Sequence, residues 1–155
     1  MISEINLKKI TSEYDADLAL LIRRILKAYH LDIPGTAFFD DALDHLSSYY
    51  AVPGRAYYVL LEGDRLLGGV GLAECPLFSN CCDLQKLYLD ESARGQGFGH
   101  KLIAYIESIA LRLGYQQIYL ETHTNLQTAI HLYENCGYRE IPKPAAVVHN
   151  TPTAK

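Results

Sequence analysis

Residues 84–102 constrain the fold more than any other stretch, because they read as a strand, a glycine-rich turn and a helix in direct succession: LQKLYLDESARGQGFGHKL. Leucines alternate with other side chains in the first part, which predicts a strand around residues 82–89. Gly95, Gly97 and Gly99 then lead into an amphipathic helix. A helix N-terminus carries unpaired N–H groups and the positive end of the helix dipole, and glycines let a ligand approach the backbone. The segment therefore predicts an anion site suited to phosphate.

Two common phosphate-binding motifs fit this turn poorly. A P-loop ends in Gly-Lys followed by Ser or Thr, whereas here His100 and Lys101 follow Gly99. A dinucleotide-binding motif has G-x-G-x-x-G directly after the strand and an acidic residue about 20 positions further on. Glu121 suits that acid, but the glycine spacing differs and a charged turn separates the glycines from the strand. A Rossmann-type oxidoreductase is therefore the less favoured alternative.

A third motif fits better. Arg94-x-x-Gly97-x-Gly99 resembles the R/Q-x-x-G-x-G/A pattern with which N-acetyltransferases of the GNAT superfamily cradle the pyrophosphate of acetyl-CoA. Further on, residues 125–138 read NLQTAIHLYENCGY, which is similar to the family's second cofactor segment, N-x-x-x-A-x-x-x-Y-x-x-x-G-[FY]. Both segments stand in the family's order and at its usual separation, so the resemblance does not rest on one loop.

The length and the 49% of hydrophobic residues indicate one globular domain, residues 1–155, and the resemblance implies that it is an N-acetyltransferase domain. A formal net charge of -4 and the lack of a basic run argue against a nucleic-acid partner. The four cysteines form no C-x-x-C pair and the six histidines are scattered, so we expect neither disulfides nor a metal site. The N-terminus lacks a signal-peptide core, and no apolar run approaches the ~20 residues that cross a bilayer. We therefore expect a reduced, cytoplasmic protein that makes no membrane contact.

Periodicity predicts strands and helices in mixed order. The expected strands cover residues 2–10, 55–61, 66–73, 82–89, 116–121 and 138–141. The expected helices cover residues 15–30, 40–50, 97–113 and 125–136. The order β-α-α-β-β-β-α-β-α-β argues against a doubly wound parallel sheet and predicts an α/β (α+β) fold, with helices flanking a mixed central β-sheet. It is also the order of the GNAT fold.

Some residues predict local details of these elements. Asp15 or Asp17 is expected to cap the helix 15–30, and Asn125 to cap the last helix. The expected strand 66–73 carries three glycines that predict a bulge or close packing: Gly68, Gly69 and Gly71.

The C-terminal segment departs from the family. GNAT proteins normally close with a further long strand, but here the remainder is PKPAAVVHNTPTAK, in which only residues 145–148 read as extended. The last strand is therefore short or absent, or a neighbouring subunit covers the sheet edge. Because an exposed edge invites association, we expect a homodimer.

The resemblance implies a set of cofactor contacts. Backbone N–H groups of the glycine turn would hold the pyrophosphate, with Arg94 adding positive charge: Gly95, Gln96, Gly97, Phe98, Gly99 and His100. The main chain of Leu87, Tyr88 and Leu89 would hold the pantetheine arm and the acetyl carbonyl, where this strand splays from its neighbour. The Leu87 N–H would stabilise charge on the thioester oxygen. Asn125 would contact the pantetheine, and the small side chain of Ala129 would keep the same face of the last helix flat.

The resemblance also implies catalytic roles. Tyr133 matches the family tyrosine that points at the CoA sulfur, and it would protonate the departing thiolate. Asp83 coincides with the glutamate that some members use as a base, although Asp is one methylene shorter and a water would extend its reach. Glu74 and Glu121 are alternative bases. The simpler interpretation of Asp83 is a carboxylate at the end of a strand that is exposed to solvent and has no catalytic role.

These expectations amount to an acetyl-CoA-dependent N-acetyltransferase. It would transfer the acetyl group to a primary amine of a small molecule or peptide by direct attack in a ternary complex, without a metal or a covalent enzyme intermediate. Residues 30–50 correspond to the family's variable substrate side. The alternative is a non-catalytic CoA-binding regulatory module, against which the presence of Tyr133 argues.

Overall fold

The computed structural model describes residues 5–141 and 148–151 of the chain. Its strands are β1 (Ile5–Lys9), β2 (Ala56–Glu62), β3 (Arg65–Glu74), β4 (Cys81–Leu89), β5 (Gln117–Glu121), β6 (Arg139–Ile141) and β7 (Val148–Thr151). Its α-helices are α1 (Asp15–Ala28), α2 (Leu46–Tyr49), α3 (Phe98–Arg112) and α4 (Gln127–Asn135). Short 3-10 turns are η1 (Ser12–Tyr14), η2 (Ala37–Phe39), η3 (Leu43–His45) and η4 (Glu91–Ala93).

The strands form one mixed sheet in the order β1-β2-β3-β4-β5-β7-β6. All neighbouring pairs are antiparallel except β4 and β5, which run parallel. The expected fold class, a mixed sheet flanked by helices, is confirmed. A doubly wound dinucleotide fold needs a mostly parallel sheet, so this topology removes the Rossmann alternative.

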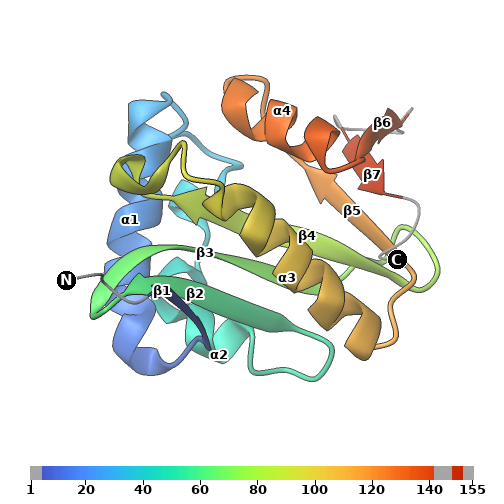
Figure 1. The fold of residues 1–155 in the computed structure, drawn as a ribbon, viewed down its shortest axis with the longest axis horizontal. Helices are drawn as coiled ribbons and strands as arrows, with labels where there is room; N and C mark the ends of the chain where they lie inside the picture. The colour runs from blue at the N-terminus through green and yellow to red at the C-terminus, as the bar shows by residue number, and fades with distance from the viewer. Residues whose placement is uncertain (1–4, 142–147, 152–155) are drawn as a thin grey trace.

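Helices cover both faces of the sheet (Figure 1). α3 lies across one face, where Leu102 and Ile106 pack against buried side chains of β2, β3, β4 and β5. α1 covers the other face, where Leu18 and Ile22 join a second buried cluster with residues of β2. Each amphipathic helix thus buries its apolar stripe against the sheet.

β4 and β5 pair only over a short length and then diverge (Figure 1). Their ladder runs from Cys81–Gln117 to Asp83–Tyr119. Beyond Asp83, β4 keeps its partner β3 on one side but lacks a strand on the other. The family's expected splay is therefore present, and it leaves one main-chain edge of β4 free.

A bulge in β4 accompanies this divergence. Gln85 pairs with Gly71 and Tyr88 with Gly69, so two residues of β4 stand opposite the single residue Val70 of β3. The first of the two, Lys86, has φ of 51°, in the left-handed region that lysine rarely adopts. β3 has an extra residue of its own, Leu67, between the partners of Leu60 and Leu61 of β2, so the bulge expected in the glycine-rich strand is confirmed.

The expected helix 40–50 is wrong in form. The structure has η3 and the four-residue α2 in its place. The Asp40 side chain accepts a hydrogen bond from the Ala42 N–H at 2.9 Å, and such a local bond favours a turn over a helix. The buried anchors Leu43 and Leu46 still face the α1 cluster.

The cap expected for α1 is also wrong. Neither Asp15 nor Asp17 caps the helix, which begins after Tyr14 without a side-chain hydrogen bond. Asp15 instead accepts hydrogen bonds from the N–H and hydroxyl of Ser47, at 2.9 and 2.6 Å. The carboxylate that the local sequence assigns to the helix end therefore forms hydrogen bonds with a residue far along the chain.

The sheet has a short last strand from the same chain. β7 pairs antiparallel with β5 on one side and with β6 on the other. It begins at Val148, whereas residues 145–147 of the expected strand lie outside the described residues. A partner subunit is therefore not needed to pair with β5, and the dimer stays a prediction without that support. Within the described residues, none of the helices is long and apolar enough to span a membrane.

Candidate active site

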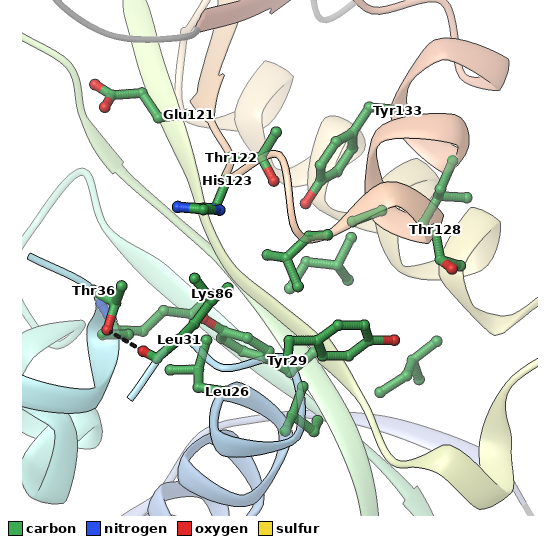
Figure 2. A pocket seen from close by; sticks show the side chains of 18 of the residues that line it. Leu26, Tyr29, Leu31, Thr36, Lys86, Glu121, Thr122, His123, Thr128 and Tyr133 are labelled. Atoms are coloured by element: carbon green, nitrogen blue, oxygen red, sulfur yellow. Dashed lines mark hydrogen bonds between the residues drawn. The ribbon is translucent and has the colours of Figure 1, made fainter. Parts of the chain in front are cut away.

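A cavity of about 570 Å³ lies where β4 and β5 diverge (Figure 2). Its walls come from the free edge of β4, the end of β5 with the following loop 122–124, one face of α4, and the end of α1 with the loop 31–37. Both sequence segments of the resemblance thus contribute to one cavity. Seven of the residues singled out from the sequence line it: Leu87, Tyr88, Leu89, Arg94, Glu121, Ala129 and Tyr133.

The glycine turn lies beside this cavity rather than in its lining. Gly95 and Gly97 have φ of 75° and 82°, which glycine adopts without strain, and an added Cβ would meet nothing within 4 Å at either. The Phe98 ring is buried in the core, so this residue offers only its main chain. Gly99 packs against α4, where an added Cβ would lie 2.7 Å from Leu132 Cδ2. Helix packing therefore accounts for this third glycine.

The backbone of the turn has free donors. α3 begins at Phe98, and the first intrahelical bond after the turn is from the Lys101 N–H to the Gly97 carbonyl. Within the described chain, the N–H groups of residues 95–100 donate to no protein acceptor. The turn, with exposed Gln96 and His100, therefore presents unpaired donors at the positive end of a helix.

Arg94 links the turn to the cavity. Its guanidinium donates to the Tyr29 hydroxyl at 3.1 Å and to the Leu89 carbonyl at 3.3 Å, and it lies 5.6 Å from the centre of the Tyr29 ring. Tyr29 lines the cavity and was missed by the sequence reasoning, because nothing local connects α1 with a turn 65 residues away. Its place near the end of an amphipathic helix predicted only a core contact.

Asn125 has a different role from the expected cap. α4 begins two residues later, at Gln127. Its N-cap residue is Leu126, and no side chain caps the helix. The Asn125 side chain donates instead to the Tyr29 carbonyl at 3.1 Å. It does not line the cavity, although Thr124 and Leu126 on either side do.

Tyr133 places a hydroxyl in the cavity. The residue is buried, and Figure 2 shows its ring reaching from α4 with the oxygen towards the interior of the cavity. Among the described residues, the hydroxyl has no hydrogen-bond partner. Burial raises the pKa of Tyr133 above its ordinary value near 10, with the nearby Tyr88 adding to the effect. The hydroxyl therefore keeps its proton at neutral pH and can donate it.

The free edge of β4 presents main-chain groups to the same space. The Asp90 N–H donates to the Leu67 carbonyl of β3 at 2.7 Å. Because N–H directions alternate along a strand, the N–H group of Leu89 points to the other side, away from β3. The hydrogen bond from Arg94 to the Leu89 carbonyl has the same direction, since the two groups of one strand residue share a side. Leu87 lies in the bulge of β4 beside this edge and lines the cavity.

The three candidate bases have different environments. Burial raises the pKa of Asp83 to about 6, although a hydrogen bond from Gln85 at 3.0 Å favours the ionised form. Asp83 is the last residue of β4 that pairs with β5, and it lies beside the cavity but not in its lining. Glu121 lines the cavity and accepts a hydrogen bond from Tyr119 at 2.8 Å.

Glu74 does not suit the role of base. It is exposed and held by a bidentate pair with Arg55, at 2.8 Å for each bond. Those hydrogen bonds lower the pKa of Glu74 to about 2. Such a carboxylate accepts protons poorly at neutral pH.

The side of the cavity opposite α4 comes from loop 31–37 and Lys86 (Figure 2). The Lys86 ammonium is 2.9 Å from an Asp40 oxygen, and the Thr36 hydroxyl donates to the Leu31 carbonyl at 2.7 Å. His123 approaches from the loop after β5. The sequence indicated this substrate side only as the broad segment 30–50, because a loop fold determines which of its residues meet the cavity.

Known proteins place this geometry in a family. Residues 21–138 match the model described as the Acetyltransferase (GNAT) family. The chain belongs to the GNAT family of acetyltransferases. It is also 34% identical over 139 residues to an uncharacterised N-acetyltransferase of Escherichia coli, YjgM, with 87% of this chain and 82% of the relative covered.

Solved GNAT structures share the fold. An acetyltransferase of the GNAT family from Staphylococcus aureus superposes with a TM-score of 0.84 at 22% identity, covering 98% of this chain and all of that one. A spermidine N-acetyltransferase from Vibrio cholerae, in complex with CoA and spermine, superposes with a TM-score of 0.68 at 22% identity. That match covers 94% of this chain and 92% of the relative. The described part of this GNAT chain contains no cluster of three or more His, Cys, Asp or Glu residues able to hold a metal ion.

Proposed function

We propose that the protein is an acetyl-CoA-dependent N-acetyltransferase that acetylates a primary amine by direct attack in a ternary complex. The observation that carries this proposal is the shared cavity. It receives a buried Tyr133 hydroxyl and, from the facing wall, the main-chain edge of β4, and neither has a partner among the described residues. A proton donor and an oxyanion donor are what thioester aminolysis requires.

The residues present fit CoA. The free N–H groups of residues 95–100, at the start of α3, suit a pyrophosphate, and Arg94 adds a guanidinium next to them. The edge of β4 from Leu87 to Leu89 offers main-chain groups to the amide-containing arm. A complex of CoA with a protein of the same fold, the spermidine N-acetyltransferase, supports this choice of ligand.

The proposed reaction forms a C–N bond and breaks a C–S bond. The amine nitrogen attacks the thioester carbon, and the Leu87 N–H stabilises the negative charge that develops on the thioester oxygen. The C–S bond then breaks, and the Tyr133 hydroxyl supplies a proton to the departing sulfur. The proton lost by the amine passes to a carboxylate, so protons and electrons balance without a metal or a covalent enzyme intermediate.

We assign the base role to Asp83. An amine attacks only in its neutral form, and a lysine-like amine has a pKa near 10.4. A base works best when its own pKa lies near the working pH, and the pKa of Asp83 is about 6. The proton passes from the amine to Asp83 directly or through one water. The water would extend the reach of a carboxylate that lies outside the cavity lining. Glu121, which lines the cavity, is the alternative.

A thiol-release assay with acetyl-CoA tests the function. The panel contains spermidine, spermine, free lysine and a peptide with a free N-terminus, and mass spectrometry identifies the acetylated product. We expect acetylation of at least one amine. Tight acetyl-CoA binding with no acetylation of any amine would instead indicate a non-catalytic CoA-binding module.

The Asp83→Asn variant tests the base. At pH values below the amine's own pKa, its rate should fall by about 10²-fold, because the proton acceptor is lost. The rate should recover in part at high pH, where more of the amine is neutral without help. Glu121→Gln is the matched variant, and a larger loss there than in Asp83→Asn would transfer the role to Glu121.

A further inference from the structure

Two polar side chains, Tyr50 and Gln85, form a hydrogen-bonded chain that reaches Asp83 from the buried side of the sheet. The Tyr50 hydroxyl donates to Gln85 Oε1 at 2.7 Å, and Gln85 Nε2 donates to Asp83 Oδ2 at 3.0 Å. Tyr50 is only 2% exposed, at the end of α2, and its ring packs against Tyr57 at 5.1 Å. A buried polar group of this kind requires a partner, and here the chain of partners ends on the proposed base.

The glycines of β3 make room for this chain. An added Cβ at Gly71 would lie 2.4 Å from Tyr57 Cδ2 and 3.2 Å from Tyr50 Cε1. The two tyrosine rings therefore lie directly against β3, and their hydroxyls reach β4. Tyr57 donates to the Lys86 carbonyl at the bulge, at 2.7 Å, and Tyr50 donates to Gln85.

The donors and acceptors fix the direction of the chain. An ionised carboxylate only accepts hydrogen bonds, so Gln85 must turn its NH₂ group towards Asp83. The amide oxygen of Gln85 then faces Tyr50, which supplies the hydroxyl hydrogen. Without Tyr50 the partly buried amide oxygen would lose its donor, and this arrangement would lose its support.

We propose that Gln85, fixed in orientation by the Tyr50 hydroxyl, is the residue that positions the Asp83 carboxylate for proton transfer. The role rests on the proposed function. It assigns a task to Gln85 and Tyr50, which act through Asp83 and do not touch the reacting atoms.

Other groups also act on Asp83. Glu121 of β5 disfavours its ionised form and Lys86 of β4 favours it, while burial has the largest effect. The remaining titratable neighbours are Tyr50, Tyr119, Cys81 and Cys82, and all four have raised pKa values. These four stay neutral near pH 7, so Glu121 and Lys86 are the charged groups that act on Asp83 there.

Carboxyl carbon-13 NMR titration of the whole, unliganded protein measures this directly, and Asp83→Asn identifies the Asp83 signal. We expect a pKa for Asp83 of about 6 in the parent. Gln85→Leu should raise it by about one pH unit, because a hydrogen bond to the charged form is lost. Tyr50→Phe should raise it by about half as much, since the amide stays but is less well held.

Tyr57→Phe is the matched control. Tyr57 is also fully buried and donates at 2.7 Å, but to the Lys86 carbonyl, with no bond to Gln85 or Asp83. Its loss should leave the pKa of Asp83 unchanged even if the protein is destabilised. An unchanged pKa in Gln85→Leu, or an equal shift in Tyr57→Phe, would overturn the proposal.

Kinetics then separate the two proposals. On the acid side of the pH profile, kcat/KM falls as the base becomes protonated. The apparent pKa of this fall should move upwards in Gln85→Leu together with the pKa measured by NMR. A shift in the NMR titration without a kinetic shift would refute proton transfer to Asp83, and with it the positioning role, while amine acetylation itself would stand. Absence of acetylation in the parent would refute the proposed function, whatever the titration shows.

Discussion

The glycine turn and α4 are the two segments that the resemblance assigns to the cofactor, and under the proposed function they would serve the site in different ways. The turn offers main chain: its glycines have no side chain, Phe98 is buried, and the N–H groups of residues 95–100 are free. α4 offers a side chain, the Tyr133 hydroxyl. A main-chain site is damaged by added atoms, whereas a side-chain site is damaged by the loss of one atom. Mutations should therefore affect affinity at the turn and rate at α4.

The largest expected effect is at α4. Tyr133→Phe should lower kcat by about 10²–10⁴-fold, the usual contribution of a general acid, and should leave acetyl-CoA affinity nearly unchanged. Steady-state kinetics and calorimetry measure the two quantities. Tyr138→Phe is the control, because this buried hydroxyl bonds to Glu107 and lies outside the cavity lining. Normal turnover by Tyr133→Phe would show that α4 does not act through this side chain.

The next effect is at the turn. Gly97→Asp should weaken acetyl-CoA binding about tenfold or more, because a carboxylate would stand close to the phosphates. Gly97→Asn has a side chain of equal size and the same strain at φ of 82°, so it separates charge from backbone strain. Calorimetry should show much weaker binding for the Asp variant than for the Asn variant. Equal affinities would mean that no phosphate lies at this turn.

Arg94→Met should weaken acetyl-CoA binding by about fivefold, since a partly exposed ion pair contributes about 1 kcal/mol. The difference between parent and variant should shrink as salt is added, because ions screen exposed charges. Calorimetry at low and high salt measures this. A difference that does not depend on salt would indicate that Arg94 supports Tyr29 and Leu89 but does not contact the ligand.

The smallest effect is expected at Gln96, whose side chain donates only to the Ser92 carbonyl at 3.0 Å. Gln96→Ala keeps the backbone of the turn and should change acetyl-CoA affinity by less than about twofold. This substitution tests whether the turn acts through main chain alone. A large loss, measured by the same calorimetry, would give the turn a side-chain contact and remove the contrast with α4.

Sequence periodicity was enough to predict the mixed sheet and the helices α1, α3 and α4, and the glycines of β3 predicted the bulge beside them. The expected helix 40–50 was wrong because a local hydrogen bond of Asp40 favours a turn. Sequence reasoning also failed where a side chain finds a partner far along the chain. Asn125 was expected to cap α4, but it bonds to the Tyr29 carbonyl 96 positions away. Asp15 was expected to cap α1, but it bonds to Ser47. A local motif gives no sign of such a competitor.

The candidate site divides in the same way. Tyr133, Arg94 and the residues 87–89 of β4 could be predicted, because each belongs to a segment with a recognisable pattern. Tyr29 could not, since its contact with Arg94 depends on how α1 packs. The positive φ of Lys86 was equally hidden, because the sequence marks left-handed positions only where glycine or asparagine stands.

The contacts of Arg94 have a consequence for the thermodynamics of binding. Its guanidinium is held by the Tyr29 hydroxyl and the Leu89 carbonyl before any ligand arrives. Immobilising so long a side chain costs up to about 2 kcal/mol of conformational entropy, and here that cost falls on folding. A ligand that takes up the guanidinium then exchanges one set of partners for another with little further loss of freedom. Under the proposed function, rigidity at the end of α1 would thus contribute to the affinity for phosphate.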